Sequence, residues 1–121
     1  MAIDVKAELK YLPISPQKVR LVLDLVRGKM ANDAVSRLKF VNKRCAVPIS
    51  RLISSAIANA ENNFGLSAEN LYIYSITADA APTRKWRRFG ARGRFKPILR
   101  RSSHIKLVLR EKEELLERKV R

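Results

Sequence analysis

Residues Pro82–Arg101 read PTRKWRRFGARGRFKPILRR, and nine of these twenty residues are lysine or arginine. The wider window of residues 80–110 holds eleven cations and no carboxylate. It therefore carries +11 of the formal net charge of +15, which leaves +4 on the remaining 90 residues. Cations crowded in this way repel one another, so the segment needs an anionic partner from outside the chain to keep one shape.

Three aromatic residues, Trp86, Phe89 and Phe95, are interleaved with these cations. Flat rings beside guanidinium groups suit stacking on exposed nucleobases, which favours nucleic acid over an acidic protein as the partner. Taken alone, a basic run of this kind also fits a disordered linker. The segments on either side of it decide between these two interpretations.

Both flanks of the basic segment are expected to be strands. Residues 69–79 (ENLYIYSITAD) are rich in β-branched and aromatic residues, and residues 103–110 alternate apolar with polar side chains. Two strands joined through a segment with Gly90 and Gly93 at its centre predict a hairpin with a long basic arm over residues 80–101. About ten residues on each side of the tip, at about 3.3 Å per residue, project the arm by roughly 30 Å.

On the outgoing side of this arm the cations fall on both faces. Arg84 and Arg88 share one face, and Lys85 and Arg87 share the other. A strand that lies on a core keeps one face apolar, so the arm is expected to be surrounded by its partner. Because a two-stranded ribbon is only marginally stable in water, we predict that the tip is mobile in the free protein and ordered when bound.

The rest of the chain predicts one further strand and three helices. Residues 2–10 alternate as a half-buried strand, which Pro13 ends. Apolar residues then recur at spacings of three and four, which predicts helices over residues 16–27, 33–40 and 43–63.

Residues with known positional preferences mark the ends of these helices. Ser15 and Asn32 are expected to cap the first two helices with their side chains, and Gly28 is a left-handed stop for the first. Pro48 falls in the first turn of the third helix or kinks it, and Gly65 follows its end.

Length and composition indicate the class of protein. A chain of 121 residues with 46% apolar content is expected to form one domain, with a body of residues 1–79 and 102–110, the arm, and a charged tail over residues 111–121. The tail is either a short surface helix or a frayed end. The single cysteine, Cys45, permits no internal disulfide, and no apolar run approaches the ~18 residues of a membrane span, so we expect a soluble, cytoplasmic protein.

Residues that support catalysis or metal binding are sparse. His104 is the only histidine, and by itself it makes neither a metal site nor an oriented base, so a structural or RNA-contacting role is expected. Cys45 has no histidine near it in the sequence and is expected to be a small buried residue. A phosphate-binding glycine loop is absent. The sequence therefore predicts no catalytic residue, no metal and no cofactor.

Three segments carry a resemblance to a known family: Ser15–Lys29 (SPQKVRLVLDLVRGK), Leu52–Gly65 (LISSAIANAENNFG) and Ala91–Leu109 (ARGRFKPILRRSSHIKLVL). In order and spacing they resemble the bacterial-type large-subunit ribosomal protein twenty-two family, and the resemblance covers nearly the whole chain apart from the tail. It implies an α+β fold in which three helices pack on a three-stranded antiparallel sheet, with a long protruding β-hairpin arm. Members often have Pro-Arg-Ala at the tip, where this chain has Phe89-Gly90-Ala91.

The resemblance also implies a function. It implies binding to large-subunit ribosomal RNA, a part in early assembly of the subunit, and an arm that lines the polypeptide exit tunnel. The expected neighbours are other large-subunit proteins, including number four near the arm, and the nascent polypeptide. The source of the ribosome, bacterial or organellar, stays open.

The residues expected to contact RNA are cations of the helices and the arm, one arm tryptophan and the histidine of the returning strand. They are Lys18, Arg20, Lys43, Arg44, Arg84, Lys85, Trp86, Arg87, Arg88, Arg92, Arg94, Lys96, Arg100, Arg101 and His104.

Other functional classes are weighed against this one. A DNA-binding architectural protein could use the ribbon as an arm inserted into a groove, and charge alone does not exclude it. A nuclease needs clustered carboxylates or histidines for a metal, which the sequence lacks. A membrane-surface role needs an amphipathic basic helix, and the cations do not follow that pattern. With no spare apolar stripe in the sequence, no self-association is expected.

Overall fold

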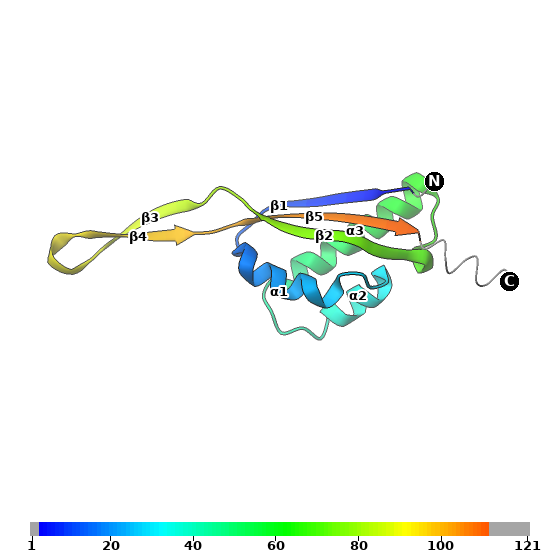
Figure 1. Cartoon of the computed structure of the whole chain (residues 1–121), viewed down its shortest axis with the longest axis horizontal. Helices are drawn as coiled ribbons and strands as arrows, with labels where there is room; N and C mark the ends of the chain where they lie inside the picture. Colours follow the sequence, from blue (N-terminus) through cyan, green and yellow to red (C-terminus); the bar gives the residue numbers. More distant parts are fainter. Residues whose placement is uncertain (1–2, 112–121) are drawn as a thin grey trace.

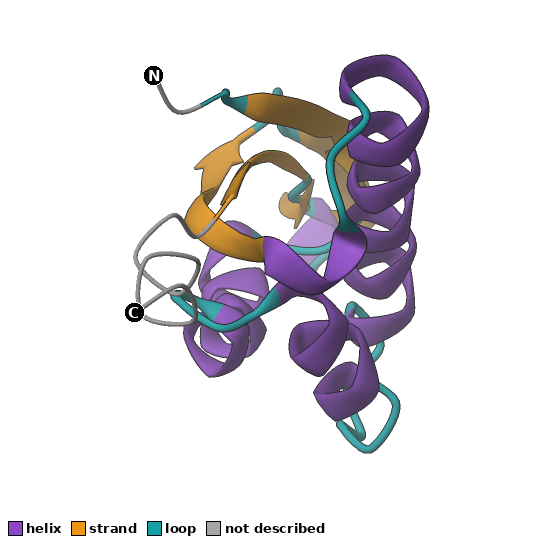
Figure 2. Ribbon diagram, turned by 90° about the vertical axis from the view of Figure 1, so that its right-hand side faces the viewer, coloured by secondary structure: helices purple, strands orange, loops and turns teal. Residues whose placement is uncertain are grey.

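In the computed structural model, which describes residues 3–111, three helices lie against one face of a three-stranded sheet, and two further strands extend from one end of it (Figures 1 and 2). The elements in chain order are β1 (Val5–Leu12), α1 (Pro16–Val26), α2 (Ala31–Leu38), α3 (Ala46–Phe64), a 3-10 turn (Ala68–Asn70), β2 (Leu71–Ala80), β3 (Arg84–Phe89), a second 3-10 turn (Ala91–Gly93), β4 (Phe95–Arg100) and β5 (Ser103–Glu111). The expected α+β architecture is confirmed.

The body sheet has the strand order β1-β5-β2, and both pairings are antiparallel. The central strand is β5, which is also the last strand in chain order. It pairs with β1 on one side and with β2 on the other. β3 and β4 pair only with each other, as a separate two-stranded ribbon. This ribbon is the basic arm that the sequence predicts, and it projects away from the helices and the sheet (Figure 1).

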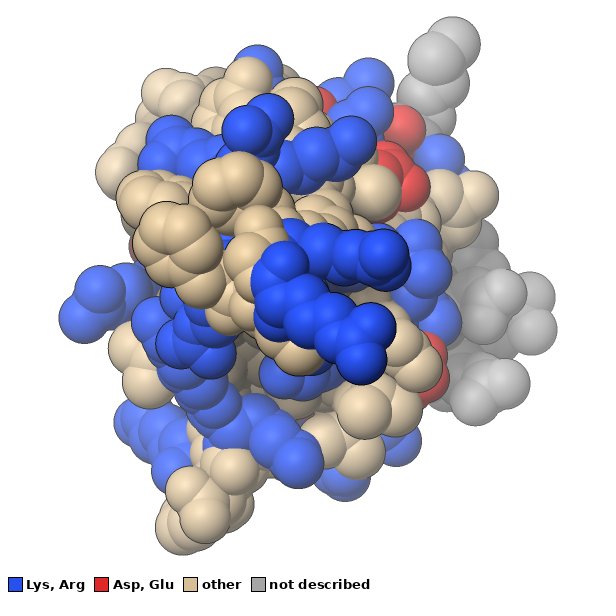
Figure 3. Space-filling model, turned by 90° about the vertical axis from the view of Figure 1, so that its left-hand side faces the viewer, with Lys and Arg blue, Asp and Glu red and all other residues tan. Residues whose placement is uncertain are grey.

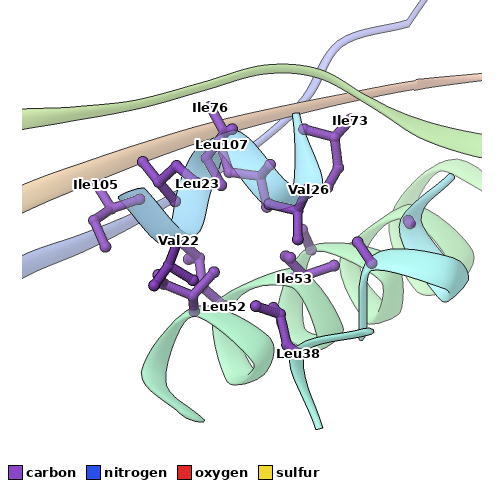
Figure 4. Packing of buried hydrophobic residues seen from close by; sticks show 14 of the residues in the cluster. Val22, Leu23, Val26, Leu38, Leu52, Ile53, Ile73, Ile76, Ile105 and Leu107 are labelled. Atoms are coloured by element: carbon purple, nitrogen blue, oxygen red, sulfur yellow. The ribbon is translucent and has the colours of Figure 1, made fainter. Parts of the chain in front are cut away.

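One hydrophobic core lies between the sheet and the helices. Inward-facing residues of the strands, such as Ile76 and Leu107, are almost completely buried, as is Leu23 of α1. In Figure 4 Leu23 points toward these two strand residues, and Val22 lies beside Leu52 of α3. Because each fully buried side chain of this size contributes roughly 1.5–3 kcal/mol, the core stabilises the body without help from the arm.

The first strand differs from its expected bounds of residues 2–10. It begins at Val5 and ends at Leu12, just before Pro13. Its pairing with β5 shifts between Leu9 and Leu12, and Tyr11 adopts a left-handed φ of 57°. This bulge reverses the alternation, so that Leu12 is buried (7% exposed) while Tyr11 is 64% exposed.

The helix ends agree with the sequence where glycine sets them and differ where tertiary contacts set them. Gly28 (φ 77°) and Gly65 (φ 64°) follow α1 and α3 in the left-handed conformation, as predicted. The predicted side-chain cap by Ser15 is wrong: only its carbonyl is used, accepting from the N–H of Val19 at 3.1 Å. Pro48 lies in the first turn of α3, which begins at Ala46 and not at Lys43.

The second helix begins two residues earlier than predicted. Its N-cap is Met30 and not Asn32, and it ends at Leu38 before Phe40. The backbone of Met30 pairs with Tyr72 of β2 as an isolated bridge, and Ala31 and Ala34 are buried. Contact with the sheet therefore fixes the start of α2, and residue preference at the cap does not.

Candidate nucleic-acid interface

The arm is joined to the body through hydrogen bonds at its root. Between β2 and β3 the N–H of Ala81 donates to the carbonyl of Ser102 at 2.9 Å, and the hydroxyl of Ser102 donates to the carbonyl of Pro82 at 3.3 Å. Ala81 itself is buried. The two chains of the hairpin therefore stay paired where the core ends, and the ribbon begins from a fixed position.

The register of the ribbon gives its two faces different chemistry. Directly opposed residues share a face, and successive residues alternate between faces. One face, here called the cationic face, holds the cross-strand pairs Arg84–Arg100, Trp86–Ile98 and Arg88–Lys96. The other, here called the mixed face, holds Lys85–Leu99, Arg87–Pro97 and Phe89–Phe95.

The cationic face has like charges directly opposite each other in two of its three pairs. Such pairs destabilise an antiparallel ladder in water. The whole stretch from residue 80 to residue 110 contains no carboxylate that could compensate them. An anion from outside the chain would compensate these charges, and a row of phosphates would do so at several points at once.

The mixed face exposes apolar surface beside its cations. The rings of Phe89 and Phe95 lie 5.3 Å apart between centroids, and the guanidinium of Arg87 lies 5.9 Å from the Phe95 ring. Phe89 remains 80% exposed. Exposed rings next to a cation suit contact with bases or with a protein neighbour more than with water.

Two glycines shape the tip for different reasons. The N–H of Gly90 donates to the carbonyl of Arg94 at 2.5 Å, and a Cβ on Gly90 would lie 2.8 Å from that carbonyl oxygen. Gly93 adopts a left-handed φ of 71°, next to Arg92 at 59°. A side chain at position 90 is thus opposed by lack of space, and one at position 93 by a backbone conformation that strains residues other than glycine.

A hollow of about 1220 Å³ lies at the root of the arm, between the ribbon and the body. Its described lining includes five cations and no acidic residue: Lys18, Arg44, Arg84, Arg100 and Arg101. Two exposed aromatic residues, Tyr11 and Trp86, also line it. Figure 3 views the molecule from the arm tip. Lysine and arginine side chains are spread over this end, and few acidic side chains are visible there.

The hollow brings together six of the residues that the sequence singles out, from three distant segments. Lys18 comes from the first turn of α1, Arg44 from the loop before α3, and the other four from the arm and its root. Among the remaining arm cations, Lys85 lies at the arm root on the mixed face, between two lining residues, and the others lie farther out along the ribbon or at its tip. Lys43 precedes α3 and is not among the lining residues.

Arg20 has a partner inside the protein. Its guanidinium donates from Nε and Nη2 to the carbonyl of Ala78, at 3.2 and 2.9 Å. Arg27 donates to the carbonyl of Ile76 at 3.0 Å in the same way. These two side chains cover backbone acceptors of β2, which is an edge strand of the body sheet.

His104 also has a partner in the body. Its Nδ1 accepts a hydrogen bond of 3.1 Å from the N–H of Tyr11, and the two rings meet edge to face with centroids 4.7 Å apart. His104 thereby supports the bulge that turns Tyr11 outward to the hollow. Tyr11 is an aromatic lining residue that the sequence does not predict, because its position depends on the bulge and the regular alternation gives no sign of it.

The remaining candidates for chemistry are inert in this structure. Cys45 is buried, and desolvation raises the pKa of its thiol, so that it stays protonated at neutral pH. Within residues 3–111, groups of three or more side chains able to hold a metal ion are not found. In the same residues every helix is too short or too polar to cross a membrane.

Comparison with known proteins supplies the family. Residues 7–110 match the family described as ribosomal protein L22p/L17e. The large ribosomal subunit proteins uL22 of Thermoanaerobacter sp. (strain X514) and Clostridium acetobutylicum are each 44% identical to this chain over 110 residues, which covers 91% of this chain and 99% of theirs. The protein of the same name from Caldicellulosiruptor saccharolyticus is 48% identical over 107 residues, 88% of each chain.

The match spans the body and the arm together, and it agrees with the resemblance that the sequence motifs indicate. The family is one of structural constituents of the large ribosomal subunit and not of enzymes. This chain belongs to the ribosomal protein L22p/L17e family.

Proposed function

We propose that this protein binds large-subunit ribosomal RNA through the arm and the hollow at its root, and that this binding supports early assembly of the subunit. The observation that carries the proposal is the cationic face, where Arg84 opposes Arg100 and Arg88 opposes Lys96 on a projecting ribbon. Two such pairs, without a carboxylate in the surrounding residues 80–110, destabilise the ribbon in water, and a bound polyanion would relieve their repulsion.

The proposed mechanism is electrostatic clamping combined with shape. Arm cations displace counter-ions from phosphates of several RNA segments, and the exposed rings fill gaps between bases. The body provides a stable anchor because its core does not depend on the arm. The arm projects from the body, so that one small protein contacts RNA segments that lie far apart.

The salt dependence of RNA binding tests this mechanism. If six phosphates are engaged, affinity for a large-subunit ribosomal RNA fragment falls by about 10³ as salt rises from 50 to 200 mM. Excess ribosomal RNA is expected to displace the protein from duplex DNA far better than the reverse. Equal displacement in both directions would favour the DNA-binding alternative, in which the ribbon enters a groove.

Assembly is tested with a pair of substitutions at the arm tip. Arg92→Ala with Arg94→Ala is expected to leave the melting temperature of the body unchanged and to reduce incorporation into the large subunit on a sucrose gradient. Lys6→Ala with Lys39→Ala removes two exposed cations of the body and serves as the control. Equal incorporation of the tip variant and the control would remove the tip from the RNA-binding surface.

We further propose that the arm lines the polypeptide exit tunnel, close to large-subunit protein number four and the nascent chain. The motifs of the arm and its returning strand support this proposal, since they carry the resemblance to the exit-tunnel hairpin. A photo-crosslinker at position 92 is expected to capture nascent chains only above a threshold length in stalled ribosomes. A crosslinker at position 39 on the body gives no such length dependence.

A further inference from the structure

The size of the hollow at the arm root sets the kind of ligand that it takes. Its volume of about 1220 Å³ exceeds the roughly 300–1,000 Å³ of sites for small molecules. It is formed by the end of β1, the start of α1, the loop before α3 and both chains of the arm. A segment of polymer therefore fits it better than a single small metabolite.

The charge of the hollow calls for more than one anionic group. Five cations line it, and the described lining contains no acidic side chain. The amino end of α1 opens at the same place, where Ser15 gives no side-chain hydrogen bond to the first turn. Free N–H groups and the helix dipole there add to the attraction for phosphate.

The apolar part of the lining distinguishes unpaired RNA from a duplex. Pro13, Ile14, Pro82 and Leu99 lie among the cations, together with Tyr11 and Trp86. The outer surface of a duplex presents phosphates and sugars, and its base faces are stacked on one another, so a duplex leaves these side chains unfilled. An unstacked base presents the flat apolar face that they match.

Trp86 occupies the position where a base and its phosphates can be bound together. It is 58% exposed and lies on the cationic face between the pairs Arg84–Arg100 and Arg88–Lys96. Neighbours on the same face of a strand are about 6.6 Å apart along the chain. A base stacked on the indole ring thus has arginine or lysine within reach on both sides.

We propose that the hollow binds an unpaired segment of RNA, with at least one base stacked on Trp86 and its flanking phosphates held by Arg84, Arg100 and Lys18. The inference rests on the proposed function and goes further, because it assigns the root of the arm to single-stranded RNA in contrast to helical RNA. Tyr11, held by His104, is the second aromatic residue of the lining.

The full-length chain can be tested directly, because Trp86 is its only tryptophan. Two RNA hairpins with the same stem are compared at 150 mM salt, one fully paired and one with a three-adenine bulge. We expect the bulged hairpin to quench Trp86 emission and to bind at least tenfold tighter than the paired one. Stacking on one aromatic side chain is worth about five- to 150-fold in affinity.

Substitutions test which side chains produce the preference for the bulged hairpin. Trp86→Ala is expected to reduce the preference for the bulge to less than about threefold and to leave the salt slope unchanged, whereas Trp86→Phe keeps most of the preference. Arg84→Gln with Arg100→Gln lowers the salt slope for the bulged hairpin by about 1.4, since each phosphate contact contributes about 0.7 for single strands. Phe89→Ala, at an exposed ring of the mixed face outside the hollow, is the matched control and keeps the preference.

The possible outcomes separate this inference from the proposed function. Equal, salt-dependent binding of both hairpins without a change in Trp86 emission overturns the inference and leaves RNA binding intact. A bulge preference that survives Trp86→Ala overturns it as well. Weak binding of both hairpins that does not depend on salt contradicts the proposed function itself.

Discussion

The body and the arm of this chain differ in what keeps them folded. In the body, apolar side chains from the three helices and three strands meet in one core, where residues such as Leu23, Ile53 and Leu107 are almost completely buried. In the arm, the residues of β3 and β4 are exposed except for Ile98, which is half-buried. The packed core therefore accounts for the stability of the body, whereas the arm has almost no buried side chains of its own, and under the proposed function its partner stabilises it.

The two regions also treat their cations differently. Arg20, Arg27 and Arg110 of the body each have a hydrogen-bond acceptor within the chain. Arm cations such as Arg84 and Arg88 instead face other cations across the ribbon. Charge in the body thus stabilises the fold, whereas the proposed function directs the charge in the arm to RNA. Each of the following predictions tests one part of this contrast.

The largest expected effect concerns the core. Ile53→Ala removes a fully buried side chain and is expected to lower the free energy of unfolding by about 2–5 kcal/mol in urea titrations. Phe95→Ala in the arm is expected to change it by less than about 1 kcal/mol, because that ring is largely exposed. Equal losses from the two variants would mean that the arm unfolds cooperatively with the body.

The next effect concerns the cationic face. Arg88→Gln with Lys96→Gln is expected to weaken RNA binding tenfold or more at 100 mM salt and to reduce the salt slope by about 1.4–1.8. The same variant is expected to melt no lower than the parent, because a like-charge pair has been removed. A lower melting temperature with unchanged RNA affinity would reverse the roles assigned here.

A smaller effect separates two cations on the same helix. Arg20→Met removes the donors to the carbonyl of Ala78 and is expected to cost about 1 kcal/mol of stability, with the salt slope unchanged. Lys18 lies two residues before Arg20 in the same helix and lines the hollow. Lys18→Met is therefore expected to reduce the salt slope of RNA binding without loss of stability. If Arg20→Met reduces the slope as much as Lys18→Met does, Arg20 contacts phosphate, as the sequence analysis predicts.

The repeating patterns of the sequence predict the helices and strands, and the family resemblance implies how they pack. Apolar spacing predicts the three helices, and the alternation of residues 103–110 predicts β5, because these patterns reflect which side of an element is buried. The missed features depend on contacts between distant segments. Met30 begins α2 because its backbone meets Tyr72, and the bulge at Tyr11 depends on pairing with β5.

The sequence predicts which residues belong to the candidate site, but not how they are arranged around the hollow. The density of arginine and lysine identifies the arm, because charge without counter-ions is visible in the sequence itself. The meeting of Lys18, Arg44 and Arg84 around one hollow is not visible there, since three segments far apart in the chain form it. The predicted short helix or frayed end of the tail falls on residues 112–121, which lie outside the described residues.

The smallest expected effect is the pH dependence of one ion pair in the body. Arg110 donates from Nε and Nη2 to the two carboxylate oxygens of Asp4, at 2.5 and 3.4 Å, and its guanidinium lies 3.5 Å from the centre of the Tyr74 ring. The hydrogen bond from Arg110 lowers the pKa of Asp4 below its ordinary value. The pair therefore stabilises the fold above about pH 4, and this contribution is lost as pH falls through the lowered pKa.

Asp4→Asn removes the titrating carboxylate and keeps a side chain of similar size. We expect the variant to melt slightly lower than the parent at pH 6, and the difference to shrink as pH falls through the lowered pKa of Asp4 and the parent carboxyl becomes protonated. High salt should also reduce the difference at pH 6, because the pair is partly exposed to solvent. Parallel melting profiles from pH 2 to pH 7 would show that the pair adds nothing to the body. Arg110 would then resemble the arm cations, whose partners lie outside the chain.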